Sequence, residues 1–237
     1  MAVATKSGIY NGYKVIGTQT LGLRGLVLWL KFNEGSGNIA YDSSFYNNHG
    51  TIYGATWTDG KFGKALSFDG VDDWVKVADS ESLNPKRITI TAWVKRDTTG
   101  VSHSIVGKFR FASNTSYYLI IRAMDTVEFI IGDGANRYAL NGNTIIDTNW
   151  HFIAATYDGA CMKIWIDGEL DNSLSVTTNI ASNTQPVTIG TWNPTAADPA
   201  HFNGTIDEVR IYNRALSENE IKMLYYNRIG AVPSKTI

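Results

Sequence analysis

Residues 150–168, with the sequence WHFIAATYDGACMKIWIDG, constrain the fold of this chain more than any other stretch. Positions 150–157 form an apolar run rich in aromatic and β-branched residues, and Asp158-Gly159 interrupts it. Apolar residues then occupy every second position over 161–167 until another Asp-Gly pair follows. Strict alternation between Asp-Gly turns is typical of an antiparallel hairpin with one buried face. Because any β-sandwich can contain such a hairpin, the pattern alone predicts only a class of fold.

Short segments of the same kind follow one another along most of the 237-residue chain. They are apolar or alternating, and Gly, Asp, Asn or Ser residues separate them. Besides the hairpin, we expect strands at 26–32, 51–53, 65–68, 74–77, 88–94, 104–108, 117–122, 127–131, 137–140, 170–176, 187–190 and 205–212. About a dozen short strands with turns between them favour an all-β sandwich of two antiparallel sheets over an α/β fold.

One segment near the C-terminus has a helical pattern instead. Ser217 and Glu220 have the spacing of a capping box, in which each side chain serves the other residue's backbone N–H. Ile221, Leu224 and Tyr225 follow with the spacing of one helix face. The sequence therefore predicts one short C-terminal helix packed on the edge of the sandwich.

The chain divides into three parts on this pattern. We expect an N-terminal arm or linker at 1–24, one domain at 25–230 and a C-terminal tail at 231–237. The arm carries apolar and aromatic residues that a free linker would not need, namely Ile9, Tyr10, Tyr13, Val15 and Ile16. Such a segment docks either on its own sandwich or on a neighbouring chain, and the second case would make a homo-oligomer.

Four separated stretches carry the resemblance to a known family. Residues 26–37 (LVLWLKFNEGSG), 63–75 (GKALSFDGVDDWV), 150–168 and 204–217 (GTIDEVRIYNRALS) resemble the laminin-G-like domains of the concanavalin A-like lectin and glucanase group. The resemblance covers roughly residues 25–228. It implies a jelly roll of two antiparallel sheets, one of them concave, that is usually non-catalytic. Domains of this group often stand beside glycoside hydrolases, adhesins and surface-layer proteins.

The first loop departs from the family's pattern. The family has Asp-x-Ser-Gly-Asn-x-Asn there, whereas this chain has Phe45 and Tyr46 in place of the Gly-Asn pair. The loop must therefore turn differently, and we expect its aromatic rings to form a local contact surface.

Composition and charge exclude several kinds of partner. The formal net charge of −1 gives no attraction to nucleic acid or to an anionic membrane surface. No apolar run approaches the ~20 residues that a membrane helix needs. The single cysteine, Cys161, cannot form an internal disulfide, and we expect it to be a small buried apolar residue. No secretory signal follows Met1. We therefore expect either a domain of a longer secreted protein or a protein assembled at a virion or cell surface without secretion.

Calcium is the cofactor that the sequence favours. Ca²⁺ takes six to eight hard oxygens at ~2.3–2.6 Å, and Asp42 and Asn48 supply such oxygens on one polar loop. The resemblance implies that the first and last strands are neighbours, which would bring Asp207 to the same site. In the alternative, Asp42 only caps a turn and Asp207 only pairs with an arginine. The four His residues and the cysteine lack the spacing of a zinc site.

Three tryptophans are candidate carbohydrate contacts, since saccharide sites combine aromatic faces with a few fixed polar groups. Trp93 and Trp165 alternate with the apolar residues of their strands, so they lie opposite the buried face, on a surface that could be concave. Trp192 lies in an expected loop and is the ring that we most expect to be exposed. In the alternative, Trp93 is a packing residue.

The sequence gives little support for catalysis. Glycosidases of this group carry carboxylates that alternate on one strand, and none of the expected strands has that pattern. Asp207 and Glu208 are adjacent and point to opposite faces, while Asp72 and Asp73 sit at a turn. We therefore expect a non-catalytic, calcium-stabilised binding or adhesion module for carbohydrate. The alternative is a structural surface protein, such as a virion decoration protein, that binds protein neighbours. A glycan-active enzyme is third.

Overall fold

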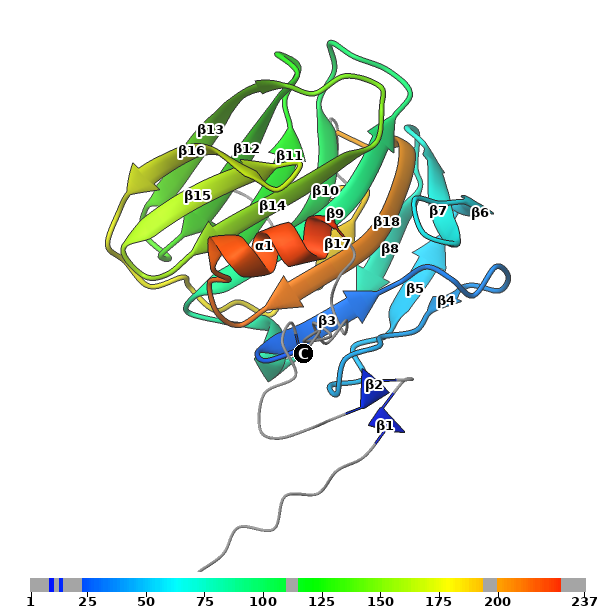
Figure 1. The fold of residues 1–237 in the computed structure, drawn as a ribbon, viewed down its shortest axis with the longest axis horizontal. Coiled ribbons are helices and arrows are strands. Elements are labelled where there is room, and N and C mark those ends of the chain that lie inside the picture. Colours follow the sequence, from blue (N-terminus) through cyan, green and yellow to red (C-terminus); the bar gives the residue numbers. More distant parts are fainter. Residues whose placement is uncertain (1–8, 11–12, 15–22, 110–114, 194–199, 227–237) are drawn as a thin grey trace, which may run out of the picture.

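The computed structural model describes residues 9–10, 13–14, 23–109, 115–193 and 200–226. These residues form two antiparallel sheets that pack face to face, with one short helix across one of them (Figure 1). The predicted all-β sandwich with a short C-terminal helix is therefore confirmed.

The first sheet has the strand order β13-β12-β11-β10-β17-β8-β5-β4. In chain order its strands are β4 (Ile39–Ala40), β5 (Gly50–Tyr53), β8 (Trp74–Val77), β10 (His103–Lys108), β11 (Tyr117–Ile121), β12 (Thr126–Gly132), β13 (Arg137–Ile145) and β17 (Val187–Ile189).

The second sheet has the order β16-β15-β14-β9-β18-β7-β6, and β3 pairs with β18 outside this order. Its strands are β3 (Leu26–Leu30), β6 (Thr56–Asp59), β7 (Lys64–Asp69), β9 (Ile88–Arg96), β14 (His151–Tyr157), β15 (Cys161–Ile166), β16 (Glu169–Ser175) and β18 (Asn203–Tyr212). The first and last strands of the domain are thus neighbours, as the resemblance implied.

The main core lies between the two sheets and follows from strand alternation. In β11, Tyr117, Leu119 and Ile121 face this core, while Tyr118 and Ile120 face outward. Because side chains of a strand point alternately to its two faces, each strand supplies the core and an outer surface together. The outer surfaces are therefore where a binding site can form.

The hairpin predicted at 150–168 is the β14–β15 pair, with Ile153 opposite Ile166. Met162 and Ile164 of β15 lie in the main core. Cys161 starts the strand on the opposite side, and its side chain is only half-buried. The expectation of a buried cysteine is therefore wrong, because β15 turns that position away from the core.

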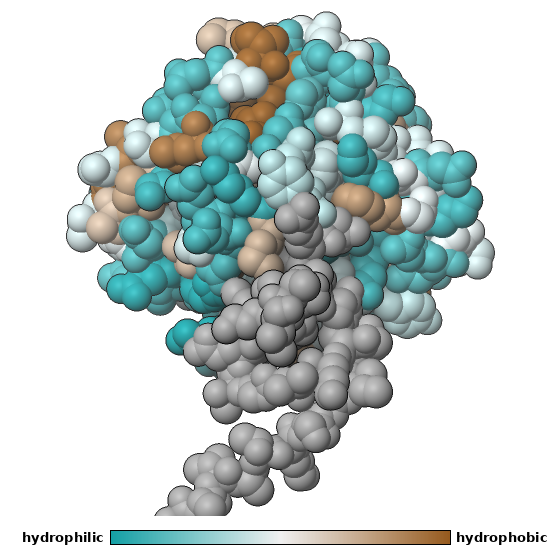
Figure 2. Space-filling model, in the orientation of Figure 1, coloured by the Kyte–Doolittle hydropathy of each residue, from teal (hydrophilic) through white to brown (hydrophobic). Residues whose placement is uncertain are grey.

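The short helix α1 (Glu218–Tyr225) begins at the predicted capping box, in which Ser217 accepts from the Glu220 backbone N–H. Its Ile221 and Leu224 are buried on the outer face of the second sheet, rather than at the edge of the sandwich. Around α1, Figure 2 shows a mostly hydrophilic surface on which hydrophobic residues form separate patches. No described helix is long and apolar enough to cross a membrane.

Two small elements complete the description. In the N-terminal arm, β1 (Ile9–Tyr10) pairs with β2 (Tyr13–Lys14), and the rest of the arm up to residue 22 lies outside the described residues. A 3-10 turn (Glu81–Leu83) precedes β9. The predicted tail at 231–237 also lies outside the described residues. The role of the arm therefore stays a prediction.

Candidate functional site

Trp93 and Trp165 lie under α1. Each side chain is only 3% exposed, within a cluster that contains Leu224 of the helix. The Trp93 ring stacks on Tyr225 with 5.6 Å between ring centroids, and the Trp165 indole donates to Thr156 Oγ1 at 3.3 Å. The expectation that these two rings lie on an open face is wrong, because the helix turns that face into a second apolar core.

Trp192 has a different environment, in the loop after β17. Its half-buried ring meets Phe109 edge-on, with 5.2 Å between centroids and 67° between planes. Phe109 in turn stacks on Tyr118 of β11 at 5.6 Å and 15°. Tyr118 is an outward-facing residue of the first sheet, so the three rings form a cluster on that sheet's outer surface.

These rings line a pocket of about 320 Å³, which we call the aromatic pocket; its polar and aromatic lining comprises Ser102, Phe109, Tyr118, Arg122, Arg137 and Trp192. Tyr118 is its most buried ring, and its hydroxyl lies 2.5 Å from Ser104 Oγ. Burial raises the pKa of the Tyr118 hydroxyl well above its usual range, so it stays neutral and offers hydrogen bonds. The buried Ser104 contact holds this ring in place.

Two arginines stand at the aromatic pocket. Arg122 follows β11, and its Nε and Nη2 both donate to one carboxylate oxygen of Glu128. Arg137 begins β13, with its guanidinium carbon 5.8 Å from the centroid of the Phe109 ring. The pocket thus combines aromatic faces, hydroxyls and fixed charge, which is the chemistry of a polar ligand site.

A second pocket of about 700 Å³ adjoins the first and shares Ser102 and Ala200 with it; its polar lining also includes Thr98, His103, His201 and Asn203. Burial lowers the pKa of both His103 and His201, so both imidazoles are neutral near pH 7. Gly70 and Val71 border this pocket from the β7–β8 turn. Because the two pockets share Ser102 and Ala200, we refer to them together as the groove.

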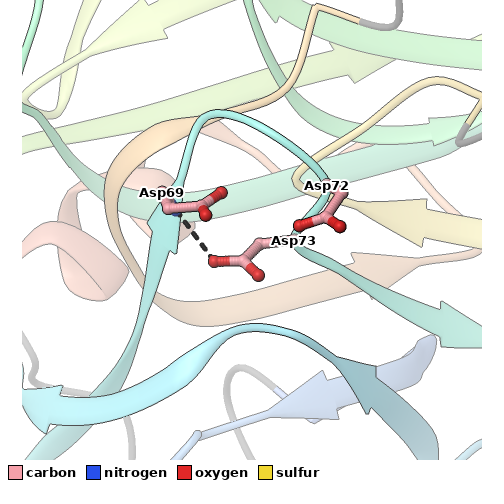
Figure 3. Close-up of side chains that lie close together, drawn as sticks. All are labelled: Asp69, Asp72 and Asp73. Atoms are coloured by element: carbon pink, nitrogen blue, oxygen red, sulfur yellow. Dashed lines mark hydrogen bonds between the residues drawn. The ribbon is translucent and has the colours of Figure 1, made fainter.

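The β7–β8 turn carries an acidic cluster, the acidic turn, made of Asp69, Asp72 and Asp73 (Figure 3). One carboxylate oxygen of each residue lies within 4.8 Å of the others. Asp73 Oδ2 accepts from the Asp69 backbone N–H at 2.8 Å, and burial is the main reason why the pKa of Asp73 is raised. Such a group of oxygens is suited to a hard cation. Sequence reasoning placed Asp72 and Asp73 at a turn but did not bring Asp69 to them.

Asp42 and Asn48 are close together and already engaged by protein groups. Asp42 Oδ1 accepts from the backbone N–H groups of Trp29 and Ser44, and Oδ2 accepts from the Asn48 N–H, all at 2.8 Å. Asn48 Oδ1 accepts from Ser80 at 2.8 Å. These contacts are those of a carboxylate that organises a loop, which was the alternative to calcium.

Asp207 lies apart from that pair. Its Oδ2 accepts from the Phe62 backbone N–H at 2.9 Å, and Oδ1 is buried without a hydrogen-bond partner. Burial raises the pKa of this carboxyl to about 7. Within the described residues, no hydrogen bond links Asp207 to Asp42 or Asn48. Calcium at this set of three therefore remains a prediction that the observed contacts do not favour.

The loop that departs from the family's pattern presents its rings to solvent. Phe45 is 60% exposed and Tyr46 is 49% exposed, as the sequence led us to expect. Tyr46 also lines a shallow pocket with Asn48, Ser80 and Ser82. This loop is a second aromatic surface, separate in its lining from the aromatic pocket.

Comparison with solved structures gives toxin and glycosidase binding domains. The binding domain of Paraclostridial Mosquitocidal Protein 1 matches with a TM-score of 0.71 and 19% identity, over 86% of this chain and 52% of that one. Domain 4 of AbnA, an extracellular arabinanase from Geobacillus stearothermophilus solved with arabinotriose, matches with a TM-score of 0.66 and 21% identity, over 84% of this chain and 98% of that one. The receptor-binding domain of a botulinum neurotoxin C/D mosaic matches with a TM-score of 0.68 and 17% identity, over 86% of this chain and 51% of that one.

The chain spans about half the length of the two toxin domains and nearly the whole of the arabinanase domain. At these identities the likeness shows the fold alone. No curated protein sequence matches the chain. A family model described as the concanavalin A-like lectin/glucanases superfamily matches residues 69–222. The predicted resemblance is thus confirmed, and the chain belongs to the concanavalin A-like lectin/glucanase superfamily.

Proposed function

We propose that this chain is a non-catalytic carbohydrate-binding module whose saccharide lies in the aromatic pocket. The observation that carries the proposal is the cluster of Phe109 and Trp192, which are half-buried and therefore keep ring surface open beside polar groups. Pyranose rings present flat C–H faces, and aromatic rings bind such faces at low entropic cost. Ser102 and the two arginines add the directional hydrogen bonds that select among sugars.

The solved relatives support binding as the general role. The arabinanase domain is described in complex with arabinotriose, and botulinum neurotoxin type C is described as depending on two ganglioside molecules to enter cells. Both descriptions concern those proteins, at about one fifth sequence identity to this chain. They make carbohydrate the first ligand class to test here. We also propose that the module acts outside a cell or at a cell or virion surface.

The charges at the aromatic pocket argue against glycoside hydrolysis. Glycosidases flank the scissile bond with two carboxyl groups, ~5–5.5 Å apart in retaining enzymes. No Asp or Glu is among the described residues that line this pocket, and Glu128, the carboxylate bound to its lining, is held by Arg122 in an ion pair. The side chains of the acidic turn line neither pocket. We therefore expect no release of reducing ends from polysaccharides.

Calcium stays part of the proposal, with the acidic turn as its place. Three converging carboxylates at Asp69, Asp72 and Asp73 offer hard oxygens, of which Asp69 Oδ1 and Asp73 Oδ2 each accept one backbone N–H, whereas the oxygens of Asp42 accept three. A cation here would fix the β7–β8 turn that borders the second pocket. It would act on stability and loop order rather than on chemistry.

Binding of a protein neighbour is the second candidate function. The exposed rings of Phe45 and Tyr46 favour it, since large apolar groups at the surface often mark contact sites. Light scattering of the wild type and of a Phe45→Ser/Tyr46→Ser variant tests it. If the wild type is monomeric at working concentration, self-association through this loop or through the N-terminal arm is ruled out.

The carbohydrate proposal is tested by a glycan array, followed by titration calorimetry with the best ligand. We expect Trp192→Ala to weaken binding at least ~10-fold, because a stacking aromatic anchor is lost. Trp74→Ala is the matched control, since Trp74 is half-buried in a stack with Tyr53 outside the aromatic pocket. Absence of any saccharide ligand, or equal weakening by both variants, would contradict the proposal.

A further inference from the structure

The described residues at the aromatic pocket carry an excess of positive charge. Arg122 and Arg137 both line the pocket, and Glu128 is the one carboxylate bound to either of them. Arg122 directs two of its nitrogens to a single oxygen of Glu128, so this pair is neutral overall. The charge that remains is the guanidinium of Arg137.

Arg137 is held near the pocket without using its hydrogen-bond donors. Its side chain is exposed, and no described residue forms a hydrogen bond or ion pair with it. Its contact is with the ring of Phe109, since a cation is attracted to the face of an aromatic ring. Many exposed arginines contact only solvent. Here the fork of N–H donors stands beside a ring that forms the wall of a pocket.

The second pocket, at the other end of the groove, has no charged side chain in its described lining. The polar lining of the second pocket is neutral, with Thr98, Asn203 and two imidazoles whose pKa values are lowered by burial. Beyond its border at Gly70 and Val71 lie the carboxylates of the acidic turn. An anionic group would be attracted to the Arg137 end, whereas the neutral lining of the second pocket offers it no such attraction. The groove therefore distinguishes the two ends of a ligand by charge.

We propose that the groove binds an oligosaccharide that carries a carboxylate, with the carboxylate on Arg137 and a neutral sugar unit in the second pocket. This inference rests on the proposed carbohydrate function, and it adds the class of sugar and its direction. Uronic acids and sialic acids share this chemistry. A guanidinium suits it better than an ammonium, because its planar fork matches the two oxygens of a carboxylate.

Matched pairs of ligands that differ only in charge test this inference. The first pair is tetragalacturonic acid and its full methyl ester, and the second is sialyllactose and lactose. Wild type, Arg137→Gln, Arg137→Lys and Lys76→Gln are titrated with all four ligands. Lys76 is the control, because it is an exposed cation on the same sheet, between the core residues Val75 and Val77 of β8.

We expect the wild type to bind the acidic member of at least one pair about 10-fold more tightly than its neutral partner, a typical gain from one charge-assisted contact. Arg137→Gln should remove this preference, because the acidic ligand should lose about 10-fold in affinity and its neutral partner much less. Arg137→Lys should keep part of it, and Lys76→Gln should keep all of it. The preference should weaken between about 50 mM and about 500 mM NaCl, because salt screens exposed charges.

The outcomes separate this inference from the proposed function. Equal affinity for both members of both pairs, or equal loss for acidic and neutral ligands in Arg137→Gln, would overturn the charge selection but leave carbohydrate binding standing. Tight binding of neutral sugars on an array, with no binding of acidic ones, would do the same. Failure of every saccharide on the array to bind would refute both. A preference confined to the sialic or the uronic pair identifies the source of the carboxylate.

Discussion

Replacing Asp207 by asparagine should change how the stability of the domain depends on pH. Asp207 is fully buried on β18, its Oδ1 has no hydrogen-bond partner, and the pKa of its carboxyl is raised to about 7. Burial is the largest cause, since it disfavours the charged form. In the unfolded chain the same group has its ordinary value of 3.8.

The sign of the effect follows from these two values. Below about pH 4 the carboxyl is protonated in both states and has no influence on folding through its charge. Between about pH 4 and pH 7 the unfolded state ionises while the folded state does not, so stability falls as pH rises. Above about pH 7 the loss is constant, and a difference of about 3 between the two pKa values corresponds to about 4 kcal/mol. Roughly 2.5 kcal/mol of this falls between about pH 5 and pH 8.

The asparagine side chain of the Asp207→Asn variant cannot ionise, and its amide oxygen can still accept from the Phe62 N–H. Its amide nitrogen would lack a partner where Oδ1 lies, which costs about 1–3 kcal/mol. We therefore expect Asp207→Asn to be about 1–3 kcal/mol more stable than wild type at pH 8 and about equal to it at pH 5. Urea unfolding at pH 5, 6, 7 and 8 in excess chelator measures both proteins. Parallel pH profiles for the two would refute the reasoning.

Four other changes have defined outcomes. Trp165→Ala should destabilise the domain by about 3–5 kcal/mol without changing the saccharide affinity of the folded protein, since the ring is buried under α1; weakened binding at unchanged stability would be inconsistent with that position. Calcium added to metal-free protein at one hundred times Kd should raise Tm, because it should stabilise the folded state by ~2.7 kcal/mol, and Asp72→Asn should reduce this rise in Tm; equal rises in both proteins would rule out the acidic turn as the site. His151 is hydrogen-bonded to Asp167 at 2.8 Å, and this contact raises the pKa of His151. His151→Gln should therefore destabilise the protein below about pH 6.5, and the effect should shrink as pH rises through the pKa of His151 in the folded state. Thermal unfolding at pH 5.5 and pH 9 measures this difference. Ser217→Ala should cost about 1 kcal/mol through loss of the helix cap, and no change in urea midpoint would count against it.

The sandwich could be predicted because its information is local. Strand alternation decides which side chains enter the core, and the capping box at Ser217 marks where α1 begins. Alternation also placed Trp93 and Trp165 opposite the core, which is correct. It could not say what covers that face, because the cover is a helix that lies much further along the chain.

The candidate site was only partly predictable for the same reason. Trp192 was predicted as a loop ring, whereas Phe109 and Arg137 were missed, since neither has a local pattern that marks a site. They meet because β10, β11 and β13 bring separate segments to one surface. The outward aromatic position of Tyr118 was the available signal. Asp42 and Asn48 were predicted as ligands, but a sequence does not show that backbone N–H groups already occupy the oxygens of Asp42 and that the Ser80 hydroxyl occupies the oxygen of Asn48.

Chemical-shift mapping tests the central claim most directly. Two-dimensional NMR spectra of ¹⁵N-labelled protein would be recorded while the best array ligand is added. The account predicts the largest shifts at the Trp192 indole N–H and at backbone amides around Phe109, Tyr118 and Arg137. Shifts that gather instead at α1 or at the exposed loop with Phe45 and Tyr46 would contradict it.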